Sequence, residues 1–265
     1  MSEQVAIIGG TGLESLPADY TFEPFTVTTP FGDASLVRVA QGSDRFVFLS
    51  RHGAAHGLAP HQINYRANIA ALAQIGVTRV LATNAVGSLR LDLLPGALVL
   101  FDDFIDFTRA RPLTFWQDHP TAPEGVVHTD FSTPYCPELR TVLEETAAGR
   151  NVDLLPRATY LCADGPRFES PAEIRMFAQW GGDVVGMTGL PEAIFAREAG
   201  LCYAGVGIVT NFGAGLTPHA VDHQAVLAAM ATNVVVVRDL VMRAALNVLP
   251  RRSCGCAGST TVSRA

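Results

Sequence analysis

The chain has 265 residues, of which 48% are apolar and 17% charged, a composition typical of a globular protein with a large core. The formal net charge of −6, with no compensating basic run or arm, argues against a nucleic-acid partner. No stretch approaches membrane-spanning length, and the start MSEQVAIIGG lacks the features of a signal peptide, so we expect a cytoplasmic protein.

Apolar runs along the chain predict strands, and most are continuous Val, Ile, Leu and Ala, the pattern of strands buried on both faces. They span 5–10, 45–50, 79–84, 97–104, 158–165, 183–189 and 202–211. Helices are predicted at 61–76, 170–182, 190–200 and 223–246. Gly76 is expected just after the first of these helices, and Ser170, Pro171 and Glu173 form a capping-box pattern at the start of the second.

Strands that alternate with helices predict an α/β fold with a mainly parallel, twisted central sheet flanked by helices. We expect one domain over residues 1–250 and a disordered polar tail over 251–265. The cysteines are Cys136, Cys162, Cys202, Cys254 and Cys256, and this odd, scattered set indicates reduced thiols. A metal site needs about four ligands. No histidine accompanies the C-G-C pair in the tail, so no metal site is expected there.

Ligands of open α/β sheets bind beyond the carboxyl ends of the strands, so the residues after each run carry the functional prediction. The first run ends in GGTGL (9–13), where backbone N–H groups and the Thr11 hydroxyl could hold an anion. A dinucleotide loop, and with it an NAD(P)-dependent oxidoreductase, is the alternative. The third glycine and the acidic residue of that fingerprint are missing, so this alternative is disfavoured.

Three further strand ends also offer anion donors. Arg51 and His52 lie in SRHG, Asn84 and the Ala85 amide in TNAVGS, and Thr188 in GMTG. Each has an ordinary explanation when taken alone, such as a surface arginine, a capping histidine or an N-cap threonine. Together they predict a binding site for inorganic phosphate or a phosphoryl group.

A second group of residues fits a planar ligand. Phe168 precedes Glu169, directly before a helix cap, and Asn211 ends the last strand. Glu169 could simply favour the helix dipole, and Asn211 could form a turn. In the functional interpretation the carboxylate accepts N–H donors from a ligand stacked on Phe168, while the amide offers both a donor and an acceptor.

The motifs IIGGTGL, RHG, NYRANI, TNAVGSL, GPRFES, VVGMTGLPEA and TNFGAG resemble, in order, the purine nucleoside phosphorylase and methylthioadenosine phosphorylase family. The resemblance runs from residue 5 to about residue 230. It implies the nucleoside phosphorylase fold, a homotrimer, and reversible phosphorolysis of a purine nucleoside to the free base and (deoxy)ribose-1-phosphate. Phosphate would be the co-substrate, and neither a metal nor an organic cofactor is expected.

The resemblance also assigns roles to individual residues. The positions that match phosphate contacts are Thr11, Arg51, His52, Asn84, Ala85 and Thr188. Those that match base or sugar contacts are Phe168, Gly186, Met187, His56, His223 and Val226. His128, in VVHTDF, corresponds to a stretch that reaches a neighbouring subunit's site.

Glu169 and Asn211 match family members that prefer 6-oxopurines, whereas members that accept 6-aminopurines have a small hydroxyl residue and an aspartate there. Glu169 can accept the N1–H of hypoxanthine or guanine, which neutral adenine lacks. Asn211 can donate to O6 and stabilise N7 as charge develops. We therefore expect a phosphorylase of inosine, guanosine and their 2′-deoxy forms in purine salvage, with Glu169 and Asn211 as catalytic residues.

The 5′ side of the substrate leaves an alternative open. His223 aligns with a contact to a 5′-hydroxyl and Val226 with the pocket wall, but overall similarity is closer to the methylthio branch. A phosphorylase of 5′-methylthioinosine or 5′-methylthioadenosine is the alternative within the class. A non-enzymatic nucleotide-binding protein and a hydrolytic nucleosidase are disfavoured, because neither needs a phosphate site beside a sugar-facing Met187.

Overall fold

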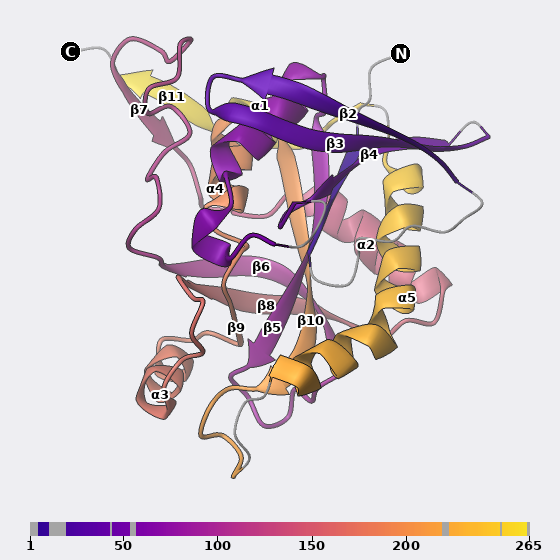
Figure 1. Cartoon of the computed structure of the whole chain (residues 1–265), viewed down its shortest axis with the longest axis vertical. Helices are drawn as coiled ribbons and strands as arrows, with labels where there is room; N and C mark the ends of the chain where they lie inside the picture. The colour runs from indigo at the N-terminus through magenta and orange to yellow at the C-terminus, as the bar shows by residue number, and fades with distance from the viewer. Residues whose placement is uncertain are drawn as a thin grey trace.

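Strand β1 (Val5–Gly9) ends within the GGTGL motif and pairs in parallel with β4 (Asp44–Ser50) and β5 (Arg79–Ser88). The computed structural model describes residues 5–10, 20–42, 44–53, 57–218, 223–249 and 251–263 (Figure 1). Within these residues the main sheet has nine strands in the order β10-β6-β8-β9-β5-β1-β4-β3-β2. The other six are β2 (Thr21–Thr29), β3 (Gly32–Gln41), β6 (Leu98–Phe107), β8 (Leu154–Ala163), β9 (Val184–Gly186) and β10 (Cys202–Phe212).

The sheet is mixed. Parallel pairs join β4, β1, β5 and β10, and also β6, β8 and β9. The β2–β3, β3–β4, β5–β9 and β6–β10 pairs are antiparallel. Because β10 pairs with both β5 and β6, the strands β10, β6, β8, β9 and β5 close into a ring.

Alternate residues of the central strands enter two separate cores, as the two-residue period of a strand requires. Ala6 and Ile8 pack into the core that holds α1 (Tyr65–Gln74) and α4 (Glu192–Glu198). Val5 and Ile7 pack into the core that holds α2 (Pro137–Gly149) and the second half of α5 (His223–Asn247). Figure 1 shows these helix pairs on opposite sides of the strands. The continuous apolar runs of the sequence follow from this two-sided burial.

The helices and strands predicted from periodicity are found close to their expected positions. Gly76 follows the end of α1 with a φ of +85°, which is the left-handed conformation that favours glycine after a helix. Helix α3 (Pro171–Gln179) begins with the predicted capping box. Ser170 Oγ accepts from the Glu173 N–H at 3.3 Å, and the Ser170 N–H donates to Glu173 Oε2 at 2.8 Å.

Some elements are not predicted by the apolar pattern. Strands β2 and β3 form an edge hairpin whose outer strand is largely exposed, so few apolar residues mark it. Helix α2 also escapes prediction, although Pro137 stands at its first position. The short 3₁₀ turn Pro60–Gln62 precedes α1.

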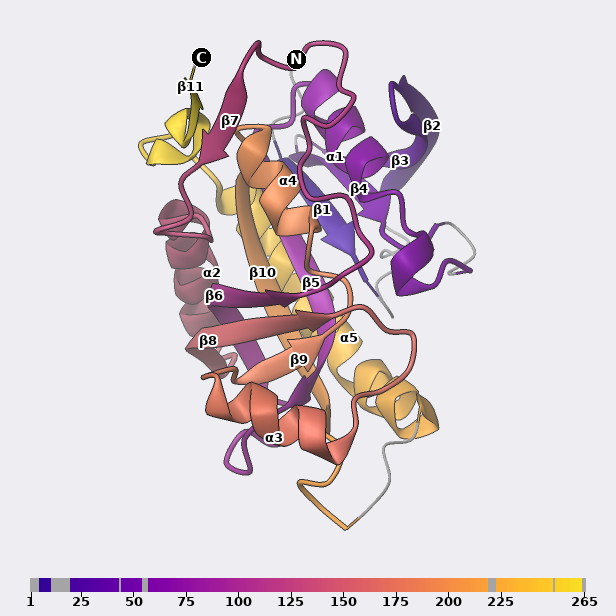
Figure 2. The same ribbon diagram turned by 90° about the vertical axis from the view of Figure 1, so that its left-hand side faces the viewer.

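The C-terminal segment is folded where the sequence predicts a disordered tail. Residues 255–258 form a 3₁₀ turn, and β11 (Thr260–Ser263) pairs with β7 (Val126–Thr129). Figure 2 shows this two-stranded sheet at the opposite end of the molecule from α3. The prediction of disorder was wrong because it relied on polar composition. The segment is stabilised by backbone pairing and by the buried Cys256, and not by an apolar run. None of the described helices is both long and apolar enough to cross a membrane.

Candidate active site

The ends of three strands line one cavity of about 330 Å³. Strand β5 contributes its carboxyl-terminal residues, β9 its last two residues, and β10 the Thr210-Asn211 pair, as expected for a site beyond strand ends. The lining residues are Gly10, Arg51, His52, Leu58, Ala59, Pro60, Ala85, Val86, Gly87, Pro166, Phe168, Glu169, Val185, Gly186, Met187, Thr188, Thr210, Asn211, Gly213 and Ala214. The cavity therefore gathers nine residues predicted from sequence: Arg51, His52, Ala85, Phe168, Glu169, Gly186, Met187, Thr188 and Asn211.

Arg51 is fixed in place by a buried ion pair. Its Nε and Nη2 donate to the two carboxylate oxygens of Glu192 at 2.7 Å each, and neither side chain is exposed to solvent. Its Nη1 donates to the Thr83 carbonyl at 2.7 Å, and the Tyr203 hydroxyl donates to Glu192 at 2.8 Å. Burial disfavours the charged guanidinium, but the Glu192 charge and hydrogen bonds hold the pKa of Arg51 above its ordinary value.

This ion pair leaves Arg51 charged and correctly oriented at the cavity. Three of its five N–H groups are used by Glu192 and Thr83, so two can bind an anion. Gly10 permits the close approach, because a Cβ there would lie 2.9 Å from Arg51 Nη1 and from the Thr83 oxygen.

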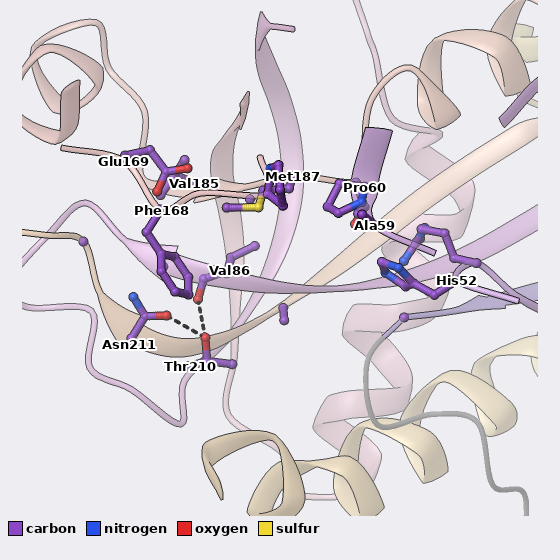
Figure 3. A pocket seen from close by; sticks show the side chains of 18 of the residues that line it. His52, Ala59, Pro60, Val86, Phe168, Glu169, Val185, Met187, Thr210 and Asn211 are labelled. Carbon is purple, nitrogen blue, oxygen red and sulfur yellow. Dashed lines mark hydrogen bonds between the residues drawn. The ribbon is translucent and has the colours of Figure 1, made fainter. Parts of the chain in front are cut away.

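His52 follows Arg51 at the same end of the cavity. Its Nδ1 donates a hydrogen bond to the Leu58 carbonyl at 2.8 Å, because a carbonyl oxygen can only accept. That bond fixes the tautomer and turns the ring beside Ala59 and Pro60 (Figure 3).

Asn84 and Thr188 meet as the sequence predicts, but with a different backbone arrangement. Asn84 Nδ2 donates to the Thr188 hydroxyl oxygen at 3.1 Å, which leaves the Thr188 hydroxyl proton as a donor. The sequence places Thr188 at a helix N-terminus, yet α4 begins only at Glu192. The backbone N–H groups of Thr188 and Gly189 donate to the buried Tyr160 hydroxyl at 3.2 and 3.0 Å, so they do not serve an anion.

The opposite end of the cavity holds an aromatic ring and a carboxylate. Figure 3 shows Phe168, Glu169 and Asn211 grouped together, with Met187 between them and His52. Phe168 keeps 39% of its surface exposed, so a ring face is available for stacking. Glu169 Oε1 is buried and hydrogen-bonds to none of the described residues. Burial raises the pKa of Glu169.

The Asn211 amide has a defined orientation. Its nitrogen lies 2.8 Å from the Phe212 carbonyl, and since a carbonyl oxygen can only accept, the atom facing it must be the NH₂ group. The Asn211 oxygen then accepts from the Thr210 hydroxyl at 2.8 Å. One Asn211 N–H is left, so this side chain can offer the cavity a donor.

Met187 is held from behind by residues that sequence reasoning did not identify. Arg111, which is 8% exposed, donates from Nη2 to the carbonyls of Met187 at 2.7 Å and Asp164 at 3.0 Å, and from Nη1 to the carbonyl of Leu190. Gly165 adopts a φ of +63°, and a Cβ there would lie 2.5 Å from Met187 Sδ. These contacts fix the Met187 loop against the cavity.

Some predicted site residues lie beyond what the structure describes. Thr11 and His56 are outside the described residues, and so are the side chains of His223 and Val226. His128 is described, and it is exposed on β7, away from the cavity. Its predicted role in a neighbouring subunit's site stays a prediction.

Sequence reasoning missed four residues that hold the site: Glu192, Tyr160, Arg111 and Thr210. Glu192 stands in the quoted motif VVGMTGLPEA, but nothing local distinguishes it from an acid in the first turn of a helix. Thr210 directly precedes Asn211, so the pair could have been considered together. Arg111 and Tyr160 come from outside the predicted motifs, and only the fold brings them to the site.

Comparison with known proteins identifies relatives that share nearly the whole length of this chain. The sequence profile of the phosphorylase superfamily matches residues 4–246. The chain is 46% identical to a probable 6-oxopurine nucleoside phosphorylase of Dictyoglomus turgidum over 96% of this chain and 95% of that protein. It is 42% identical to a probable S-methyl-5′-thioinosine phosphorylase of Methanopyrus kandleri, over 96% of each. A solved methylthioadenosine phosphorylase of Schistosoma mansoni in complex with adenine superposes with a TM-score of 0.86 at 35% identity, over 91% of this chain and 90% of that one.

Proposed function

Because the chain belongs to the phosphorylase superfamily, we propose that it catalyses the phosphorolysis of 6-oxopurine nucleosides. The substrates are inosine, guanosine and their 2′-deoxy forms, and the products are the free purine and (deoxy)ribose-1-phosphate. The likeness to a probable 6-oxopurine nucleoside phosphorylase at 46% identity supports this substrate class. Such a reaction belongs to purine salvage.

The single observation that carries the proposal is the Glu169 carboxylate. Its Oε1 atom is buried and has no hydrogen-bond partner among the described residues, an arrangement that is costly and is best explained by a ligand N–H that completes it. Glu169 lies beside Phe168 at the end of the cavity where a planar ring can stack. A 6-oxopurine carries N1–H as a donor, whereas neutral adenine has only an acceptor at N1.

Asn211 contributes the donor that the departing base requires. As the C1′–N9 bond breaks, the purine takes the electron pair, and negative charge develops on the ring. The remaining Asn211 N–H can donate to N7 or O6, and the Phe212 carbonyl holds the amide in the donating orientation. Glu169 and Asn211 are therefore the proposed catalytic residues.

The other end of the cavity suits the phosphate co-substrate. Arg51 offers two N–H groups, Thr188 its hydroxyl proton and Ala85 its backbone amide, and His52 adds an Nε2–H donor when its imidazole is protonated. A phosphate oxygen forms the new bond to C1′ as the bond to N9 breaks, and the purine is released after it takes up a proton. Positioning and charge stabilisation carry this reaction, and the proposal includes neither a catalytic metal nor an organic cofactor.

A methylthio nucleoside is the second candidate substrate. The likeness to a probable S-methyl-5′-thioinosine phosphorylase and to a solved methylthioadenosine phosphorylase supports it. His223 and Val226, which the resemblance assigns to the 5′ side, would distinguish a 5′-hydroxyl from a methylthio group. Because Glu169 can accept the N1–H of a 6-oxopurine, 5′-methylthioinosine is favoured over 5′-methylthioadenosine as well.

The proposal also includes a cytoplasmic homotrimer in which His128 reaches the neighbouring subunit's site. The exposure of His128 on β7 is compatible with such a contact. Sedimentation analysis tests the assembly, and His128→Ala tests the contact through the KM for the nucleoside.

The experiment for the proposed reaction measures hypoxanthine release from inosine with and without inorganic phosphate. We expect turnover to require phosphate, and undiminished release without it would refute phosphorolysis. Glu169→Ser should lower kcat/KM for inosine by more than about tenfold, or about 1.4 kcal/mol. Glu145→Ser, a matched change on the exposed face of α2, should leave it unchanged.

A further inference from the structure

Four of the five cysteines converge at one point of the fold. The sulfur atoms of Cys136, Cys202, Cys254 and Cys256 all lie within 4.8 Å of one another. All four are free thiols. Sequence reasoning considered only the C-G-C pair, because the other two ligands lie far away along the chain.

Three segments bring these cysteines together. Cys136 directly precedes α2, where its N–H donates to the Tyr203 carbonyl at 2.8 Å. Cys202 begins β10, and Cys254 and Cys256 flank the start of the 3₁₀ turn after α5. The cluster thus joins the C-terminal segment to the central sheet and to α2.

The sulfur geometry fits a single shared centre. A tetrahedral ion with metal–sulfur bonds of about 2.3 Å holds its four sulfurs about 3.8 Å apart. Here Cys202 Sγ and Cys254 Sγ are 3.4 Å apart, and no pair exceeds 4.8 Å. Two separate disulfides would require only two close pairs, whereas every pair among these four is close.

The surroundings suit a charged, buried complex. Cys136, Cys202 and Cys256 are at most 1% exposed, and Cys254 is partly exposed. Arg197 Nη1 lies 3.2 Å from Cys256 Sγ, and donates toward it. A divalent ion with four thiolates carries about two negative charges, and this guanidinium offsets one of them.

We propose that Cys136, Cys202, Cys254 and Cys256 bind one zinc ion as a structural tetrathiolate site. We assign the site to zinc because this ion is bound by four sulfur ligands in a tetrahedral arrangement and needs no redox partner. On binding, the four thiols lose their protons to the solvent and the four thiolates bond to the ion.

The position of the metal site in the fold indicates a role in stability and not in catalysis. Asn211 lies nine residues beyond Cys202 along β10, which corresponds to about 30 Å of extended strand. The metal site instead anchors the segment that carries β11 and pairs with β7. Its loss should loosen that two-stranded sheet and leave the chemistry at the other end of β10 intact.

The test measures the metal content of the full chain, purified under reductant from cells grown with added zinc. We expect about one zinc per chain in the wild type. Cys256→Ser and Cys254→Ser should each lower the zinc content at least about tenfold. Cys162→Ser, which removes the one cysteine outside the cluster, should keep it.

A second measurement covers the case in which these variants fail to fold. Wild-type protein stripped of metal and loaded with Co²⁺ should develop the thiolate-to-cobalt charge-transfer band and the visible bands of a tetrahedral ion. Protein that binds neither zinc nor cobalt would overturn the proposal. Four free thiols would then mean a plain thiol cluster, and four oxidised thiols would mean two disulfides.

Discussion

The buried Arg51–Glu192 pair gives the sharpest stability prediction. Glu192→Gln keeps the shape of the side chain and removes its charge, so the fully buried guanidinium of Arg51 loses its only ionic partner among the described residues. Breaking a buried pair from one side costs about 3–5 kcal/mol, because it leaves an uncompensated buried charge. The glutamine oxygen retains one of the two hydrogen bonds, so we expect about 3 kcal/mol.

Thermal unfolding measures this loss. An unfolding entropy of about 2.1 cal/mol/K per residue over 265 residues gives about 0.56 kcal/mol/K, so 3 kcal/mol lowers Tm by about 5 °C. Tyr203→Phe is the matched control, because it removes one hydrogen bond to the same carboxylate but keeps both charges of the ion pair, and it should cost about 1.5 kcal/mol. The KM for phosphate should also rise in Glu192→Gln, since Arg51 loses its orientation. A Tm equal to that of the wild type, with an unchanged KM for phosphate, would refute the reasoning.

The remaining predictions concern the cavity itself. Asn211→Asp places a carboxylate oxygen against the Phe212 carbonyl, so the ratio of kcat/KM for inosine to that for adenosine should fall by about tenfold or more. An unchanged ratio would contradict the role of Asn211 as a hydrogen-bond donor to the base. Arg111→Lys cannot reach all the carbonyls that Arg111 holds, so the KM for the nucleoside should rise by about tenfold, whereas Arg140→Lys should leave it unchanged. Burial raises the pKa of Glu169 above its ordinary 4.5, and the ionised carboxylate accepts N1–H more strongly than the protonated carboxyl does. As the pH falls, the kcat/KM for inosine should therefore begin to decline at a higher pH than it would if an exposed glutamate stood at this position. Glu169→Gln, which has no titratable carboxyl, should abolish this decline on the acid side.

Most of the cavity residues that were predicted from sequence stand at or just after the end of an apolar run, whereas Phe168 and Glu169 precede a helix cap. The runs identify buried strands, and the carboxyl ends of such strands meet at one edge, so Asn211, Thr188 and Ala85 could be assigned to one site before the structure was known. The capping box at Ser170 was equally predictable, because its signal lies within four consecutive residues.

Contacts between distant segments carried no such signal. Arg51 and Glu192 are 141 positions apart, and only the packing of α4 against the sheet brings them together. The same reason explains the cysteine cluster, whose ligands come from α2, β10 and the C-terminal segment. The folded tail was mispredicted because composition reports the apolar content of a segment and not the pairing of its backbone.

The central claim, that Glu169 and Asn211 select the 6-oxo base, is tested most directly by comparing four substrates in the presence of phosphate. These are inosine, adenosine, 5′-methylthioinosine and 5′-methylthioadenosine, with kcat/KM measured for each. We expect the kcat/KM of each 6-oxo nucleoside to exceed that of its 6-amino counterpart by at least about tenfold, with inosine the best of the four. A lead for 5′-methylthioadenosine would contradict it.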